Sequence, residues 1–411
     1  MKLKVTAPKT IQQCTIELPP SKSIANRVLI LSALNGVKPE KVLRRPLTEL
    51  CDDIRVVAEM LQRDDEVVDV CAAGTAMRFG TAYLAVTDGT RTITGTERLQ
   101  ERPIGILVDA LRSLGARIEY VGKEGFPPLR ITGKSHLRGG SLTMNGGVSS
   151  QFISALLMIA PTMQEGLTLK LEGQLVSTPY LYITQELMRQ FGASVEWTDE
   201  RTIRVEPGYN DRQEEKTVMI EADWTAASYW YEIASIAHLQ PSVFHLQSLC
   251  SDSIQGDRVC DEIFRLLDQQ QTKQEPFEYD FEDCPDLVQT LVVTCCMNAV
   301  PFRFTGLRTL RIKETDRISA LQTELAKMGF ALEATDDSLS WNGSTLNSKL
   351  STLNSKLSIS TYHDHRMAMA FAPCALRMGE IIIEDPDVVS KSYPTYWSDL
   401  EKIGFELCYI S

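Results

Sequence analysis

Arg311-Ile-Lys-Glu-Thr-Asp-Arg317 carries five charged residues among seven, with both signs interleaved. The stretch follows a strand-like run, 301–307, and precedes a helical pattern that begins at Ile318. Thr315 or Asp316 suits the N-cap of that helix, so we expect Lys313 and Glu314 in the turn ahead of it. Unpaired backbone N–H groups point outward at a helix N-terminus, which suits such a turn to holding an anion. The alternative is a solvated turn whose charges neutralise one another.

Lys22 falls at the expected start of a helix that follows Pro19-Pro20. Ser23 and Arg27 are four residues apart, so they share one face of this helix. A lysine, an arginine and a hydroxyl near a helix N-terminus are suited to binding an oxyanion. A capped helix start with surface charges is the alternative.

Gly74 lies in Ala73-Gly74-Thr75-Ala76-Met77-Arg78, which is expected to open a buried helix. The stretch is neither GxGxxG nor a Walker loop, so it does not indicate nucleotide binding. Gly74 permits a ligand to approach the backbone closely, although a glycine at such a turn often serves geometry alone. Arg102 directly precedes Pro103, and we expect this proline to start the next helix.

Ser149, Ser150 and Gln151 follow a glycine pair and precede another apolar helix. They supply neutral donors suited to a phosphate or to hydroxyl groups, and helix capping would explain one of the serines. Asp286 leads into the apolar helix expected over 287–297. It either caps this helix or acts as a base on a substrate hydroxyl.

Two further positions near the C-terminal end of the chain carry possible chemistry. His363-Asp-His365-Arg366 has a spacing that invites a metal site, but the chain has five histidines and no third ligand is evident, so we expect no metal. Lys391 lies in a loop before the last helical pattern, where a lone lysine is usually exposed to solvent.

Composition limits the classes of function. The 411 residues are 43% hydrophobic and 23% charged, as in ordinary globular proteins, and a length above about 300 residues favours more than one domain. A net charge of −12 argues against a nucleic-acid surface, so anion binding requires a local basic cluster. No signal peptide or membrane span is expected. The ten cysteines show no zinc-like spacing and are expected to be buried thiols in a reducing cytoplasm.

The elements that position these residues repeat along the chain. Four segments show an amphipathic helix that ends at a glycine and is followed directly by a short alternating strand. They are Leu107–Tyr120, Thr184–Trp197, Leu321–Glu333 and Tyr396–Cys408. The interval between the second and third leaves room for a degenerate copy near Phe264–Asp268, and another fits near Ala58–Gln62. Six units of roughly 68 residues would then fill the chain.

Each unit also holds a more apolar helix, which we expect to be buried. These helices are expected at Phe79–Val86, Phe152–Ile159, Ala226–Ala237, Leu287–Met297 and Arg366–Leu376. Helices inside and sheets outside, in two bundles of three units, follow from this pattern. We expect the chain to cross between the bundles at Gln12–Pro20 and Glu221–Trp224. This predicts one lobe over 20–221 and a second over 1–19 and 222–411.

One segment lies outside the scheme. The heptapeptide STLNSKL occurs twice in succession over 344–357. Two copies rich in Ser and Asn do not make a coiled coil, so we expect a duplicated surface loop without a function of its own.

Together these stretches resemble the EPSP synthase family, the 3-phosphoshikimate 1-carboxyvinyltransferases. The similarity is collinear over nearly the whole chain, and RIKETDR and DHRMA are its most specific parts. The matching stretches are PSKSIANR (20–27), AGTAMR (73–78), ERPIG (101–105), GGVSSQF (146–152), STPY (177–180), PD (285–286), RIKETDR (311–317), DHRMAMAF (364–371) and Lys391. The resemblance implies an α/β fold, a two-domain inside-out α/β barrel in which each domain has three repeats with buried parallel helices and outer four-stranded sheets.

The resemblance also implies an activity, the transfer of the enolpyruvyl group of phosphoenolpyruvate to the 5-hydroxyl of shikimate 3-phosphate. Asp286 would be the base and Glu314, with Lys22, the proton donor. Shikimate 3-phosphate would be held by Lys22, Ser23, Arg27, Ser149, Ser150, Gln151, Ser177, Tyr180, Asp286 and Lys313. Phosphoenolpyruvate would be held by Lys22, Gly74, Arg102, Gln151, Arg317, Arg366 and Lys391. No metal or organic cofactor, no nucleic acid and no membrane is expected, and the protein is expected to be a cytoplasmic monomer.

Both substrates are anions, so cations from both lobes are expected to offset their repulsion, with closure of the lobes on the substrates. The chain departs from the family pattern at Ala72, Phe79 and Thr309, where Asn, Pro and Asn are common. UDP-N-acetylglucosamine enolpyruvyl transferase is the nearest alternative. That family usually carries a reactive cysteine in the loop that is Gly95–Glu101 here, and this loop has none. A non-catalytic repeat protein that binds anions is the alternative from another class.

Overall fold

The computed structural model describes residues 1–43, 46–209, 218–270, 275–344 and 357–410. The chain divides into two compact units, Pro20–Ile220 and Met1–Pro19 with Glu221–Ser411, so it passes between them twice. Most of the duplicated heptapeptide over 344–357 lies outside the described residues. In the part of the chain that is described, no helix is both long and apolar enough to span a membrane.

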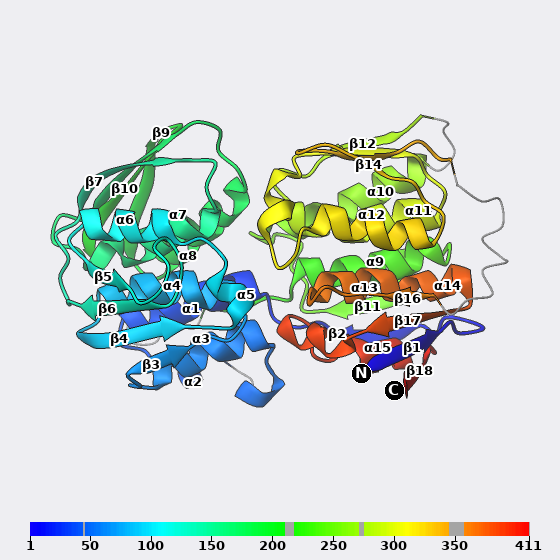
Figure 1. Ribbon diagram of the computed structural model, residues 1–411, viewed down its shortest axis with the longest axis horizontal. Coiled ribbons are helices and arrows are strands. Elements are labelled where there is room, and N and C mark those ends of the chain that lie inside the picture. Colours follow the sequence, from blue (N-terminus) through cyan, green and yellow to red (C-terminus); the bar gives the residue numbers. More distant parts are fainter. Residues whose placement is uncertain (44–45, 210–217, 271–274, 345–356, 411) are drawn as a thin grey trace. The chain divides into compact units, whose positions relative to one another are not determined.

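The unit Pro20–Ile220 contains two four-stranded sheets around a group of helices (Figure 1). Their orders are β3-β4-β6-β5 and β7-β8-β10-β9. The elements are α1 (Lys22–Leu34), α2 (Pro39–Val42), η1 (Leu47–Glu49), α3 (Asp52–Gln62), β3 (Val67–Asp69), α4 (Gly74–Ala85), β4 (Gly89–Thr94), α5 (Glu97–Gln100), α6 (Gly105–Ser113), β5 (Arg117–Tyr120), β6 (Leu129–Gly133), β7 (Gly140–Asn145), α7 (Ser150–Ile159), η2 (Ala160–Thr162), β8 (Leu167–Glu172), α8 (Thr178–Gln190), β9 (Ala193–Asp199) and β10 (Thr202–Tyr209).

The other unit contains two four-stranded sheets, β12-β13-β15-β14 and β16-β17-β1-β18, and a two-stranded sheet, β11-β2. Its elements are β1 (Lys2–Thr6), β2 (Cys14–Glu17), α9 (Trp224–Ile236), η3 (Pro241–Val243), β11 (Phe244–Gln247), η4 (Gly256–Val259), α10 (Cys260–Gln270), β12 (Phe277–Asp280), η5 (Pro285–Leu287), α11 (Val288–Met297), β13 (Phe302–Thr305), η6 (Arg308–Ile312), α12 (Arg317–Lys327), β14 (Glu333–Ala334), β15 (Leu339–Trp341), β16 (Ser358–Ile359), α13 (His365–Phe371), η8 (Ala372–Cys374), α14 (Ala375–Met378), β17 (Glu380–Glu384), η9 (Pro386–Lys391), α15 (Tyr396–Lys402) and β18 (Glu406–Ile410).

All four larger sheets share one topology. In each, the first two strands are parallel and every later pairing is antiparallel. A buried helix connects the parallel strands, as α4 connects β3 to β4 and α11 connects β12 to β13. In the last sheet, β1 from the start of the chain occupies the position that the closing hairpin strand fills elsewhere. This pairing is why the first residues belong to the second unit.

In four repeats a glycine follows the second helix where the sequence pattern predicts it. Gly115, Gly192, Gly329 and Gly404 have φ of +104°, +88°, +89° and +103°, a left-handed conformation that glycine adopts without steric cost. Each follows its helix, α6, α8, α12 or α15, and precedes a strand. The two degenerate copies also form helices, α3 and α10.

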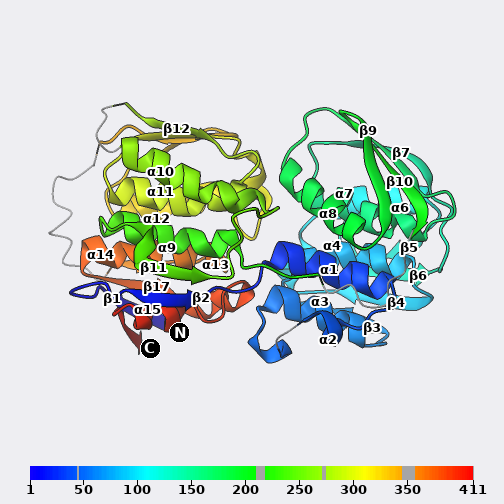
Figure 2. The same cartoon turned by 180° about the vertical axis from the view of Figure 1, so that it is seen from behind.

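The apolar helices are buried as predicted. Every residue of α11 and α13 is buried, as is every residue of α7 except Gln151. Figures 1 and 2 show α9, α11 and α13 between the sheet of β12 and the sheet of β17 within their own unit. The amphipathic α3, α6, α10 and α12 keep polar residues exposed.

Three expectations about local structure are corrected. Among the described residues, each unit has two four-stranded sheets and not three. In the unit Pro20–Ile220 the described residues between α1 and α3 form short helices and turns, where Pro39 and Pro46 disfavour a strand, and in the other unit the third sheet, β11-β2, has two strands. Six of the ten cysteines are buried, but Cys71 and Cys408 are exposed, at a turn after β3 and on the edge strand β18. The helix expected from Pro103 begins two residues later, at Gly105.

Candidate active site

Asp286 lies at the centre of an ion-pair cluster in the unit that contains the C-terminus. Its Oδ1 lies 2.9 Å from Arg317 Nη1, and its Oδ2 lies 2.8 Å from Arg366 Nη2. Lys313 Nζ is 3.8 Å from the same Oδ1. The interpretation of Asp286 as a helix cap is wrong, because Leu287 is the N-cap of α11. Asp286 sits one residue earlier, in η5, where its carboxylate contacts cations from three other segments.

Glu314 contacts Arg317 as well and one further cation, Lys391. Its Oε2 lies 3.1 Å from Arg317 Nη2, and its Oε1 lies 3.3 Å from Lys391 Nζ. The Lys391 side chain is only 12% exposed, so the expectation of a solvent-exposed lysine is wrong. Lys391 ends η9 and is brought to Glu314 from 77 residues further along the chain.

Arg317 links these carboxylates to a third one. Asp316 caps α12 by accepting from Ser319 N at 3.1 Å, as predicted, which makes Arg317 the first helical residue. Arg317 Nε donates to Asp364 Oδ2 at 2.7 Å, and the two side chains are 2% and 0% exposed. Burial alone would lower the pKa of Arg317, but Asp364, Glu314 and Asp286 hold it above its ordinary value. The guanidinium is therefore charged and fixed in orientation.

The remaining two cations of the cluster respond differently to their surroundings. Burial opposes the charge of Arg366, but Asp286 and further anions raise its pKa above the ordinary value. Packing lowers the pKa of Lys313, although 28% of its side chain stays exposed, and Asp286 only partly offsets this. Four cations, Arg317, Arg366, Lys313 and Lys391, therefore contact the carboxylates of Asp286, Glu314 and Asp364, and Asp257 and Asp223 also interact with Arg366.

Lys22 forms an ion pair in the unit Pro20–Ile220. Its Nζ lies 3.1 Å from Asp53 Oδ2, and the side chains are 18% and 7% exposed. Lys22 begins α1, as predicted, and Asp53 lies in the first turn of α3. The sequence argument missed Asp53, because an acidic residue there also fits the usual preference for the helix N-terminus.

Arg27 is buried among the helices of the same unit. Its Nε donates to Thr184 Oγ1 at 2.7 Å, and Nη2 donates to Ser154 Oγ at 3.1 Å. Nη1 donates to the carbonyl oxygen of Ser23, four residues earlier in α1, at 2.8 Å. Burial lowers the pKa of Arg27 to about 10, and the partners named here are neutral. A bound anion near this guanidinium would stabilise its positive charge and so raise the pKa that burial lowers.

Phe79, one of the departures from the family pattern, packs against Arg27. The guanidinium carbon of Arg27 lies 5.3 Å from the centre of the Phe79 ring. This cation–π contact supports a buried arginine that has neutral hydrogen-bond partners. Thr309, another departure, has a buried hydroxyl oxygen without a hydrogen-bond partner among the described residues.

Gly74 lies against two guanidinium groups. A Cβ atom at this position would be 2.6 Å from Arg78 Nη1 and 2.7 Å from Arg102 Nη1, closer than real contacts allow. Arg78 Nη1 also donates to the Gly74 carbonyl oxygen at 2.8 Å. Gln151 Nε2 donates to Thr75 Oγ1 at 3.0 Å, which brings the first turn of α7 to that of α4. Arg78 belongs to the AGTAMR stretch but received no role from the sequence.

The predicted hydroxyl groups lie at helix N-termini. Ser149 and Ser177 are the N-caps of α7 and α8, and neither side chain makes a capping hydrogen bond. Ser177 has φ of +54°, which is uncommon for a residue with a side chain and is often found at functional sites. The Tyr180 carbonyl oxygen accepts from Thr184 Oγ1 at 2.8 Å and from Arg27 Nη2 at 3.3 Å.

The two histidines of the HxH spacing do not share a site. His363 is exposed and lies 2.9 Å from Asp385, whereas the His365 side chain is buried. Over the described ranges, no group of three or more His, Cys, Asp or Glu side chains is placed to hold a metal ion.

Each unit therefore holds part of the predicted residue set. One carries Asp286, Lys313, Glu314, Arg317, Arg366 and Lys391 in a single ion-pair cluster. The other carries Lys22, Arg27, Gly74, Arg102 and Gln151 with their neighbours. Both sets combine fixed cations with hydroxyl, amide or carboxylate groups. The cations suit the binding of ligands that carry phosphate or carboxylate groups, and the carboxylates can exchange protons with a bound ligand.

Comparison with known proteins identifies similar chains. A family model described as EPSP synthase (3-phosphoshikimate 1-carboxyvinyltransferase) matches residues 48–400. The chain is 50% identical over 419 residues to a 3-phosphoshikimate 1-carboxyvinyltransferase of Bacteroides fragilis, with 98% of each chain covered. It is 34% identical over 429 residues to the protein of that name from Shewanella halifaxensis, with 95% of this chain and 96% of that one covered.

Two solved structures share the fold. An EPSP synthase from Acinetobacter baumannii superposes with a TM-score of 0.71 at 19% identity, covering 100% of both chains. The enolpyruvyl transferase NikO from Streptomyces tendae superposes with a TM-score of 0.67 at 13% identity, covering 100% of this chain and 99% of that one. These likenesses support a mixed α/β fold.

Proposed function

The chain belongs to the EPSP synthase family and transfers the enolpyruvyl group of phosphoenolpyruvate to the 5-hydroxyl of shikimate 3-phosphate, and from this premise we propose that Asp286, Glu314 and Lys22 carry the chemistry. The products are 5-enolpyruvylshikimate 3-phosphate and phosphate, and the reaction belongs to the shikimate pathway of aromatic amino-acid biosynthesis.

Asp286 acts as the base on the 5-hydroxyl. Arg317, Arg366 and Lys313 surround its carboxylate and favour the ionised form, which is the form that accepts a proton. The same cations lower the basicity of Asp286. Anionic substrates that bind to these cations offset part of this effect. The hydroxyl oxygen then forms a bond to C2 of phosphoenolpyruvate as its proton passes to Asp286.

Glu314 donates a proton to C3 of phosphoenolpyruvate in the same step, so that the methylene group becomes a methyl group. Its pairing with Arg317 and Lys391 favours the carboxylate, so the acid role requires that Glu314 gains a proton in the substrate complex, and a nearby substrate phosphate would favour the protonated form. In the second step Glu314 takes a proton back from C3, the electrons of that C–H bond form the C2=C3 double bond, and the bond from C2 to the phosphate oxygen breaks. Phosphate leaves with the proton that Asp286 accepted, which restores Asp286 as a base. Lys22 assists Glu314 in donating the proton to C3 in the first step.

The substrate-binding residues extend over both units. We assign shikimate 3-phosphate to Lys22, Ser23, Arg27, Ser149, Ser150, Gln151, Ser177, Tyr180, Asp286 and Lys313. Phosphoenolpyruvate is assigned to Lys22, Gly74, Arg102, Gln151, Arg317, Arg366 and Lys391. The neutral surroundings of Arg27 and the two guanidinium groups beside Gly74 support an anion near each.

The finer architecture and the setting of the protein are part of the same proposal. We infer lobes over 20–221 and over 1–19 with 222–411, each an inside-out arrangement of three repeats with buried parallel helices; the shared sheet topology supports this. A net charge of −12 supports small-molecule partners without nucleic acid, and we propose a monomer. Adjacent free thiols at Cys295 and Cys296 support a reducing cytoplasm.

The observation that carries the proposed roles is the pair of contacts that Arg317 makes to Asp286 and Glu314. A phosphate-release assay tests the proposal. Release should require both phosphoenolpyruvate and shikimate 3-phosphate, and neither substrate alone should support it. Release with UDP-N-acetylglucosamine in place of shikimate 3-phosphate would contradict the assignment, and no release with any acceptor would favour a non-catalytic anion-binding protein.

A further inference from the structure

Glu324 is a buried carboxylate that the proposed mechanism does not use. It lies on α12, and its side chain is fully buried. Its Oε1 accepts from the Tyr362 hydroxyl at 2.7 Å, and its Oε2 accepts from Ser360 N at 3.2 Å and from Lys327 Nζ at 2.5 Å. Lys327 Nζ also donates to the carbonyl oxygen of Ser358 at 3.0 Å. A carboxylate with three such donors fixes the segment that supplies two of them.

This segment, Ser358–Asp364, follows one face of α12. Glu324 comes about two helical turns after Arg317, so the two side chains share a face of the helix. At the start of α12, Arg317 Nε donates to Asp364 Oδ2 at 2.7 Å. About two turns later, Glu324 holds the residues that precede Asp364. The helix therefore binds the segment at both of its ends.

The first residues of the segment are held separately. Ser358 and Ile359 form β16, which pairs with β17. Glu384, at the end of β17, accepts from Ser358 Oγ at 2.9 Å and from Ser360 Oγ at 2.6 Å. These contacts stop two residues before Tyr362, so the bond from the Tyr362 hydroxyl is the contribution that Glu324 makes to the rest of the segment.

The turn that this hydroxyl holds has an unusual backbone. Tyr362 and His363 have φ of +55° and +57°, a left-handed conformation that is uncommon for residues with side chains. Such a conformation persists only where the surroundings fix it, and it is often found at functional sites. Tyr362 is fixed by Glu324, and His363 Nδ1 lies 2.9 Å from Asp385 Oδ2. Asp364 follows directly, so its position depends on this turn.

Asp364 connects the turn to two arginines assigned to phosphoenolpyruvate. Its Oδ2 accepts from Arg317 Nε, and its Oδ1 caps α13 by accepting from Arg366 N at 2.9 Å. Both guanidinium groups also contact the Asp286 carboxylate, Arg317 at 2.9 Å and Arg366 at 2.8 Å. A shift of the Asp364 carboxylate would therefore move both arginines relative to a bound anion.

We propose that Glu324 is a positioning residue for the binding of phosphoenolpyruvate. By holding the Tyr362 hydroxyl, it fixes the turn before Asp364. That carboxylate in turn keeps Arg317 and Arg366 in place. The inference rests on the proposed roles of these two arginines, and it adds to them a buried group about two helical turns away.

Tyr362→Phe tests this link with little disturbance. Tyr362 is 36% exposed, and the variant leaves Glu324 its bonds to Ser360 and Lys327, so it should fold. We expect the KM for phosphoenolpyruvate at saturating shikimate 3-phosphate to rise about tenfold, because a hydrogen bond to a charged group is lost. The KM for shikimate 3-phosphate should change little, since most residues assigned to it lie in the unit Pro20–Ile220. An unchanged KM for phosphoenolpyruvate would overturn the proposal.

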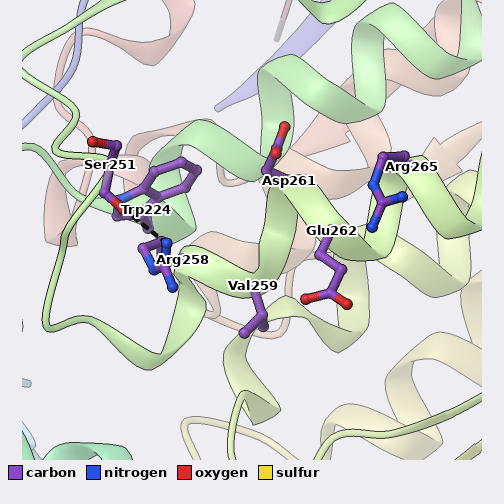
Figure 3. A pocket seen from close by; sticks show the side chains of 7 residues that line it. All are labelled: Trp224, Ser251, Arg258, Val259, Asp261, Glu262 and Arg265. Carbon is purple, nitrogen blue, oxygen red and sulfur yellow. Dashed lines mark hydrogen bonds between the residues drawn. The ribbon is translucent and has the colours of Figure 1, made fainter.

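Tyr231→Phe is the matched control. The Tyr231 hydroxyl, on α9, donates to Asp261 Oδ1 at 3.1 Å, so this variant also removes a bond from a tyrosine to a carboxylate in the same unit. Asp261 lines a pocket of about 410 Å³, bounded by Trp224 and by residues between Ser251 and Arg265, which include none of the proposed substrate-binding residues (Figure 3). Both variants should lose a similar, small amount of thermal stability. A purely structural role of Tyr362 predicts that loss without a change in the KM for phosphoenolpyruvate.

A double-mutant cycle shows whether the hydroxyl acts through Glu324. Glu324→Gln keeps the size of the side chain and removes its charge, so it should raise the KM for phosphoenolpyruvate by itself. Adding Tyr362→Phe to Glu324→Gln should then raise this KM little further, because the link is already broken. Effects that multiply, as at independent sites, would contradict the link. If Glu324→Gln does not fold, the comparison of Tyr362→Phe with Tyr231→Phe still decides.

Equilibrium binding separates this inference from the proposed function. Calorimetry measures the affinity for phosphoenolpyruvate in the presence of 5-deoxyshikimate 3-phosphate, which lacks the hydroxyl that the reaction consumes and so allows no turnover. If the wild type releases no phosphate with both substrates, yet this affinity falls about tenfold in Tyr362→Phe and not in Tyr231→Phe, the proposed function fails and the role of Glu324 stands. If phosphate is released and both variants bind phosphoenolpyruvate as the wild type does, the role of Glu324 fails alone. If the wild type binds no phosphoenolpyruvate, both fail.

Discussion

Arg317 Nη1 lies 2.9 Å from Asp286 Oδ1, and this ion pair joins the proposed base to a cation assigned to phosphoenolpyruvate. The same guanidinium contacts Glu314, the proposed acid, at 3.1 Å. Acid, base and anion-binding groups therefore share one hydrogen-bonded cluster. On the proposed roles, a substrate anion that binds to these cations would compete directly with the two carboxylates and so couple binding to the protonation state of the proposed acid and base.

The proposed catalytic groups can be removed with little change in shape. Lys22→Met, Asp286→Asn and Glu314→Gln should fold normally and lose turnover by about 100-fold or more, because each removes a proton-transfer group or a fixed charge. Initial rates of phosphate release measure the loss, and circular dichroism checks the fold. Lys41→Met and Glu380→Gln, at exposed positions, are the matched controls. Near-normal rates in all three variants would refute these roles.

Gly74→Ala should impair phosphoenolpyruvate binding selectively. The added Cβ would come within 2.6 Å of Arg78 Nη1 and 2.7 Å of Arg102 Nη1, so both guanidinium groups must move. We expect the KM for phosphoenolpyruvate to rise about tenfold or more, with little change in the KM for shikimate 3-phosphate. Gly122→Ala, where a Cβ would meet only ordinary contacts, is the control. An unchanged KM would show that the guanidinium groups beside Gly74 are not part of the site.

Asp364→Asn should destabilise the unit that contains the C-terminus. Asp364 is fully buried and accepts from Arg317 Nε at 2.7 Å, so its neutralisation leaves a buried guanidinium with less compensation. A loss of about 3 kcal/mol in the free energy of unfolding is expected, measured by chemical denaturation. Asp336→Asn, at an exposed position in the same unit, should change stability little. A loss no greater than that of the control would indicate that Arg317 is held mainly by its other partners.

Glu232 should make stability depend on pH. Its side chain in α9 is fully buried, neither oxygen has a hydrogen-bond partner among the described residues, and burial raises its pKa well above the ordinary value. A raised pKa in the folded state means that the stabilising contribution is complete below the unfolded-state pKa and is lost as pH rises through the folded-state pKa. Glu232→Gln should therefore stabilise the protein more at about pH 9 than at about pH 5.

Denaturation curves at several pH values measure this difference. Glu278→Gln, an exposed carboxylate on β12, is the control and should show no such trend. An equal effect of Glu232→Gln at every pH would mean that the folded protein binds no extra proton at this position.

Features that depend on a few neighbouring residues were predictable from the sequence. The glycines at 115, 192, 329 and 404 end their helices as expected, and Asp316 caps α12, because both effects act within one helical turn. The helix start expected at Pro103 was wrong for a related reason. A proline is compatible with a helix start but does not require one, and the helix begins at Gly105.

The residue types of the candidate site were also predictable, because they lie in stretches whose spacing is specific. By itself the sequence determined the repeat, most of the helix starts and most of the charged groups of the candidate site, though not Asp53 or Arg78. Only the tertiary structure decided which groups meet. Asp53 reaches Lys22, Asp364 reaches Arg317 and Lys391 reaches Glu314 from 31, 47 and 77 residues away. The physical reason is range: a cap or a turn is decided within about four residues, whereas the partner of a buried charge is decided by which helices pack against one another.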